Sequence, residues 1–156
     1  MTPKHFLLFI TVFASLSFAN AQNKQTDSTI VATTLRSLLS ICKNVDFADP
    51  KTTKPGTFYK AAPYILYRGS DKKRAWKDFA NYKNAKEKKG VDEVCTRINE
   101  SVNRDNGYQI LNYITQKESE GIWHVITISY KKDGVEKRAA FAFLKIGNRF
   151  GLGDID

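Results

Sequence analysis

His124 is the side chain in this sequence that most readily suggests chemistry. It lies in the stretch GIWHVITISY at 121–130, whose alternation is typical of a strand with one buried face. His124 shares its face with branched aliphatic residues, so we expect the imidazole to point into the core. There it could act as a general base or hold a ligand. The alternative is a structural histidine whose nitrogens are satisfied by hydrogen bonds.

Two polar side chains on the expected neighbouring strands could join this histidine. Asn112 and Arg138 fall on the His124 face if each strand alternates regularly. Ala140 and Ala142 are small and would leave room on that face. The sequence therefore predicts a concave pocket lined by Asn112, His124 and Arg138, with no catalytic role assigned to any of them.

Cys42 and Cys95 are the two cysteines, and each lies on the apolar stripe of an expected helix. A cysteine pair in an exported protein suggests a disulfide. The alternative is two buried free thiols that behave as small hydrophobic side chains. Together with His124 they do not match the spacing of a metal site, so we predict no metal and no cofactor.

Cationic side chains crowd the stretch DKKRAWKDFANYKNAKEKK at 71–89, in a chain of formal net charge +9. Lys72, Lys73, Arg74 and Lys77 make a candidate anion-binding face. Interleaved aromatic residues would suit nucleic acid or another anionic polymer. The alternative is a solvated helix face, and a steep salt dependence of binding would distinguish the two.

The first residues predict the compartment. MTPKHFLLFITVFASLSFANAQ at 1–22 has a basic start, an apolar run over 6–18 and small residues at Ala19 and Ala21. This pattern predicts a signal peptide at 1–21, cleaved after Ala21, and a secreted or periplasmic chain. The apolar run is too short for a comfortable membrane span, and no later segment is long enough to be one. Export makes intracellular nucleic acid a poor partner.

The remaining residues, 22–156, are expected to form a single α+β domain. Apolar periodicity predicts helices over 28–46 and 72–83 and a third that carries Val91, Cys95 and Ile98. The segment 57–69 is interpreted as extended. Alternating stretches at 108–116, 121–130, 136–146 and 149–155 predict four strands, and Asp133-Gly134 predicts a hairpin turn between the second and the third. The expected architecture has N-terminal helices packed on a curved antiparallel four-stranded meander.

The last stretch, FAFLKIGNRFGLGDID at 141–156, carries a family resemblance. Helices followed by a meander that closes on an aromatic strand, a short turn and a final strand resemble the NTF2-like, cystatin-related α+β cone. The resemblance implies a concave sheet with helices over it and a pocket at the open end. It implies no activity, because that superfamily contains enzymes, binding modules and interaction domains.

These observations lead to one expected function and two alternatives. We expect an exported, non-enzymatic domain that binds a small molecule or a protein partner in a concave sheet pocket. The first alternative is a small lyase, isomerase or hydrolase that uses His124. The second is an electrostatic binder of anionic surface polymers through residues 72–89.

Overall fold

The structure is a computed structural model, and it describes residues 26–43, 57–102 and 107–156. The predicted signal peptide at 1–21 and the last residues of the first predicted helix lie outside these ranges.

Four antiparallel strands form a sheet of order β1-β2-β3-β4. Their bounds are Tyr108–Glu118 for β1, Gly121–Lys132 for β2, Val135–Ile146 for β3 and Arg149–Ile155 for β4. Asp133 and Gly134 turn the chain between β2 and β3 with φ angles of 54° and 77°, the pair of positive values that a two-residue hairpin turn needs. The four predicted strands and their order are confirmed, and the class is α+β.

One face of this sheet, here called the inner face, belongs to the core. On β2 it carries His124, Ile126 and Ile128, and these pair across to Phe143, Phe141 and Ala139 of β3. All six side chains are buried. The alternation in β2 and β3 therefore arises because every second side chain is removed from water.

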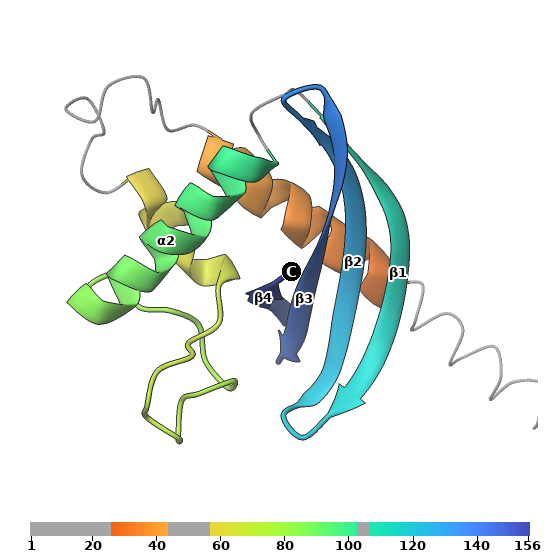
Figure 1. Ribbon diagram of the computed structural model, residues 1–156. Coiled ribbons are helices and arrows are strands. Elements are labelled where there is room, and N and C mark those ends of the chain that lie inside the picture. Colours follow the sequence, from red (N-terminus) through yellow and green to blue (C-terminus); the bar gives the residue numbers. More distant parts are fainter. Residues whose placement is uncertain (1–25, 44–56, 103–106) are drawn as a thin grey trace, which may run out of the picture.

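Two helices complete the core (Figure 1). Residues 26–43 are helical, and the apolar stripe of this helix is buried. The second helix, α2, spans Ala85–Ser101 and begins at Asn84, whose side chain accepts hydrogen bonds from the backbone N–H groups of Lys86 and Glu87. A disulfide between Cys42 and Cys95, with Cα atoms 4.9 Å apart, ties the two helices together.

The segment before α2 extends the sheet beyond β4. Two short 3-10 helices, η1 at Thr57–Lys60 and η2 at Ala62–Tyr64, lead into extended backbone at 65–67. There Leu66 N donates to Leu152 O at 2.8 Å, and on the other side Ala80 N donates to Ile65 O at 2.9 Å. The extended structure expected over 57–69 is therefore wrong for η1 and η2 and is found from Ile65 onward.

The helix predicted over 72–83 is wrong. Residues 72–77 form turns, and Trp76 has a φ angle of 62°, which a right-handed helix does not allow. Trp76 packs edge to face on Trp123, with ring centroids 5.3 Å apart. Trp76, which was expected on the apolar side of a helix, thus packs against the sheet instead.

No helix in the described ranges is long and apolar enough to cross a membrane.

Candidate functional site

His124 is buried on the inner face, with 5% of its surface exposed. Its Nδ1 lies 2.6 Å from the hydroxyl oxygen of Tyr113, and its ring meets that of Phe150 edge to face at 4.8 Å. Burial lowers the pKa of His124, and Lys145 lowers it further, while Asp27 acts in the opposite direction. Because the imidazole is held neutral, Nδ1 can accept the tyrosine proton when the ring hydrogen is on Nε2.

Tyr113 and the ion pair beside it complete this polar cluster. Burial raises the pKa of Tyr113, so the hydroxyl stays protonated and able to donate. Lys145 Nζ lies 2.8 Å from a carboxylate oxygen of Asp27, which pairs the start of helix 26–43 with β3. A catalytic histidine is usually oriented by a carboxylate or amide partner. Within the described ranges no carboxylate or amide side chain hydrogen-bonds to His124. The contact between Tyr113 and His124 is therefore interpreted as an internal polar contact between β1 and β2.

Asn112 and Arg138 do not join His124. The register pairs Asn112 with Thr127 and Arg138 with Ser129, and both partners lie on the opposite face of β2 from His124. For Asn112 the cause is a shift in register between Ile110 and Asn112, which moves the rest of β1 to the other alternation. The three residues of the predicted pocket are therefore not brought together, and Ala140 and Ala142 also line the outer face.

The predicted anion-binding face is divided by the structure. Arg74 is committed to acidic partners: its Nε lies 2.8 Å from Asp78, and its two terminal nitrogens lie 2.9 and 3.1 Å from the carboxylate oxygens of Glu87. Lys72, Lys73 and Lys77 are exposed on the turns of 72–77. Of the four residues predicted to bind anions on a helix face, these three lysines remain exposed, and they lie on turns.

A groove runs between α2 and the sheet edge formed by residues 65–70 and β4. It has two adjacent parts, of about 410 and about 190 Å³, which share Ile65, Arg68, Glu93 and Val94. We call it the α2 groove. The larger part is also lined by Leu66, Tyr67, Gly69, Ser70, Ala80, Asn84, Lys86, Glu87, Gly90 and Val91, and the smaller part by Arg97, Leu152, Gly153, Asp154 and Ile155.

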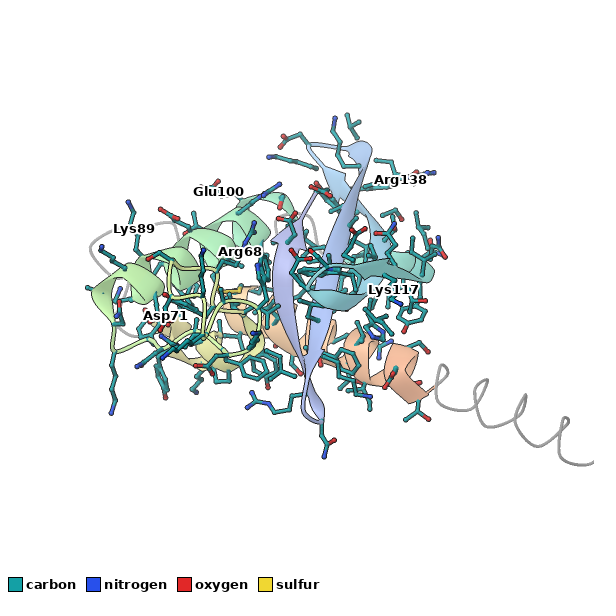
Figure 2. All side chains as sticks on the ribbon, turned by 90° about the horizontal axis from the view of Figure 1, so that it is seen from below. Arg68, Asp71, Lys89, Glu100, Lys117 and Arg138 are labelled. Carbon is teal, nitrogen blue, oxygen red and sulfur yellow. A yellow bond between two sulfur atoms is a disulfide. The ribbon has the colours of Figure 1, made fainter. Side chains whose placement is uncertain are left out.

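The floor of the α2 groove is apolar and its rim is charged. Ile65, Leu66 and Val91 are buried beneath it. On the sheet side, Arg68 donates to the backbone oxygen of Gly153 at 2.6 Å and pairs with Asp154 at 3.2 Å. Figure 2 shows Arg68 between α2 and the strands. These contacts hold the guanidinium beside the smaller part of the groove.

The wall nearest the start of α2 is fixed by Glu87. Its carboxylate receives two nitrogens of Arg74 and, at 2.7 Å, the backbone N–H of Asn81. The Arg74 guanidinium, with these hydrogen bonds, holds the pKa of Glu87 below its ordinary value. Glu87 therefore serves to position the turns of 72–81 against α2 and is not free to bind a ligand.

Gly90 lines the larger part of the α2 groove. It lies inside α2, and a Cβ built on it would meet no heavy atom within 4 Å. Glycine inside a helix is less favourable than alanine by about 1 kcal/mol, so local helix stability does not explain its presence. Sequence reasoning missed this groove, although the glycine directly before Val91, the first residue of the third predicted helix's apolar stripe, was a signal that could have indicated it.

Comparisons with protein-family models, with curated proteins and with solved structures found no match to this chain. The class that the structure defines is an α+β domain with a four-stranded antiparallel sheet, and its function is argued from the site alone. In the described residues no three His, Cys, Asp or Glu side chains gather as metal ligands would.

Proposed function

We propose that this protein is an exported binding domain whose ligand is a small amphipathic molecule held in the α2 groove. An apolar floor with a few charged groups at the rim is the usual composition of a small-molecule site. The floor would receive the apolar part of the ligand. Arg68, Lys86 and Glu93 stand at the rim to meet its polar groups.

The observation that carries this proposal is the α2 groove itself, of about 410 and about 190 Å³ in its two parts, with Ile65, Leu66 and Val91 buried beneath it. The groove walls are fixed by the hydrogen bond that Glu87 accepts from Asn81 N–H and by the one that Arg68 donates to Gly153 O, so the space does not depend on a ligand to form. A preformed site loses little conformational entropy when it binds.

Export is supported by two features. The first residues of the chain have the pattern of a cleaved leader. The Cys42–Cys95 disulfide suits an oxidising compartment. An NTF2-like cone, which the sequence resembles, would also accommodate a curved meander with helices beside it.

A binding role is favoured over catalysis by His124. The imidazole is almost fully buried, its ring packs on Phe150, and the partner the structure gives it is a tyrosine hydroxyl. A general base must reach the proton that it abstracts, and this buried ring, whose Nδ1 meets the Tyr113 hydroxyl, offers little surface to a substrate.

A thermal-shift screen of the purified protein against a metabolite library, with heparin included and at two salt concentrations, tests the proposal. A hit should stabilise the wild type and fail to stabilise Gly90→Phe, whose ring would fill the groove. Gly90→Ala is the matched control, since its single methyl group leaves most of the space open and binding should persist. Stabilisation that survives in Gly90→Phe would place the ligand elsewhere.

Heparin provides the second arm of the screen. Stabilisation by heparin alone, lost at high salt, would favour the exposed cations Lys72, Lys73 and Lys77 as the binding surface. It would count against the α2 groove as the principal site.

A further inference from the structure

The two edges of the sheet are treated differently. Beyond β4, Leu66 pairs with Leu152, and residues 78–80 pair with the extended segment in turn. At the other edge β1 is eleven residues long, and no described strand pairs with its outer side. An open edge of this length presents unpaired N–H and C=O groups to any other strand.

Antiparallel alternation identifies which backbone groups face the open edge. The two-residue turn at 119–120 closes on the pair Glu118 and Gly121. That pair is hydrogen-bonded in a hairpin of this kind, and the pattern then alternates along the strand. Tyr113, Thr115 and Lys117 therefore turn their N–H and C=O groups outward.

The regular half of β1, Asn112–Glu118, has few of the features that protect a sheet edge. It contains no proline, and its two charges, Lys117 and Glu118, both lie at the hairpin end. Ile114 stands at the middle with 40% of its surface exposed. The register shift that interrupts β1 lies beyond this segment, after Ile110.

We propose that β1 pairs antiparallel with β1 of a second copy of this chain, centred on Thr115. In this register every outward-facing residue meets an outward-facing residue, because Tyr113 lies opposite Lys117 and Thr115 lies opposite itself. Glu118 then meets Asn112, so no like charges are opposed.

Charge favours a second copy at this edge over other surfaces of the molecule. The chain has a formal net charge of +9, so most contacts between two copies bring cations together. Residues 108–118 carry one lysine and one glutamate and are neutral as a strand. Lys117 lies at the β1 edge of the sheet, across the strands from α2 (Figure 2), so this contact leaves the α2 groove open.

Sedimentation velocity of the purified protein over a concentration series tests the proposal. The wild type should shift from monomer to dimer as concentration rises. Thr115→Pro should remain monomeric, because proline removes an N–H that faces the open edge and leaves the ladder to β2 intact. Ile114→Lys should also remain monomeric and serves if the proline variant fails to fold.

Val135→Lys is the matched control. It exchanges another exposed apolar side chain for lysine at the start of β3, away from β1, and should dimerise as the wild type does. A wild type that stays monomeric at every concentration would overturn the proposal. This holds even if the β1 edge of that monomer binds an unrelated extended peptide. A dimer that persists in both edge variants would overturn it as well.

Discussion

Arg74 and Glu87 form a two-pronged ion pair that joins the turns of 72–81 to the first turn of α2. The two nitrogen–oxygen distances are 2.9 and 3.1 Å, and the carboxylate side chain is only 7% exposed. The Arg74 guanidinium also lies over the Tyr67 ring, 4.2 Å from its centroid. A residue that the sequence assigned to an anion-binding face therefore holds one wall of the α2 groove in place.

Replacing Arg74 should destabilise the fold and disturb this groove. In Arg74→Ala the buried carboxylate of Glu87 loses its charged partner, and the turns of 72–81 lose their tie to α2. Arg74→Lys should fall between alanine and wild type, because an ammonium group cannot reproduce the planar fork. The measurement is the midpoint of urea unfolding together with affinity for a ligand found in the thermal-shift screen.

Lys77→Ala is the control for that pair of variants. Lys77 is an exposed cation from the same turns, so its loss should change the unfolding midpoint little. Equal effects of Arg74→Ala and Lys77→Ala would show that the ion pair with Glu87 contributes nothing specific.

The Cys42–Cys95 disulfide should supply a large part of the stability. The two residues are 53 apart in sequence, and closing a loop of that length in the unfolded chain is worth about 4 kcal/mol in the chain-entropy account. Cys42→Ala/Cys95→Ala should unfold at lower urea by a corresponding amount. Reductant should weaken the wild type and leave the double variant unaffected, and a wild type indifferent to reductant would contradict this expectation.

Features whose signals lie close together in the chain were predictable from the sequence. The strands follow from alternation and from turn residues such as Asp133-Gly134, and the apolar stripes of two helices place both cysteines in the core. His124 was expected to point inward and does so. In each case the spacing of apolar residues within the element itself indicates which face is buried.

Features that depend on distant contacts were not predictable. A single extra residue in β1 moved Asn112 to the outer face, and nothing in YQILNYITQ marks that position. Trp76 and Phe79 have helical spacing, yet Trp76 packs on Trp123 and Phe79 lies beside Gly151. The helix predicted over 72–83 therefore does not form. Arg74 finds Glu87 thirteen residues away, so the cationic stretch could not reveal which of its charges are already paired.

Two identical substitutions should have opposite effects on stability. A Cβ at Gly153 would lie 2.5 Å from an atom of the Trp123 ring and 2.9 Å from Trp76, whereas one at Gly90 meets open space. Gly153→Ala should therefore cost about 1–3 kcal/mol through overpacking. Gly90→Ala should instead stabilise α2 by about 1 kcal/mol. Urea denaturation of both variants measures the difference.

Adding Trp123→Leu to Gly153→Ala tests the cause. The smaller side chain removes the ring that lies nearest the new methyl group, so the alanine should cost less in this background than in the wild type. If its cost is unchanged, the loss at Gly153 arises from Trp76 or the backbone and not from the Trp123 contact.

The stability of the fold should fall on mild acidification because of His124. Burial holds its folded pKa below the ordinary value of about 6.5, so below that pH the unfolded chain binds a proton at this position and the folded chain does not. The free energy of unfolding should thus decrease as the pH falls from about 7 toward the lowered folded pKa. The paired carboxylates of Asp78 and Glu87, whose folded pKa values are also lowered, should add their loss only at more acid pH, below about 4.

His124→Gln isolates the histidine contribution, since glutamine can still accept from Tyr113 and does not titrate. Its unfolding free energy, measured by urea denaturation across a pH series, should stay nearly level between about pH 7 and about pH 5, where the wild type loses stability. Tyr113→Phe is the control, because it removes the hydroxyl and leaves the imidazole buried, so the wild-type slope should remain. Parallel slopes in wild type and His124→Gln would mean that the imidazole titrates alike in the folded and unfolded chain, and that its burial does not govern its charge.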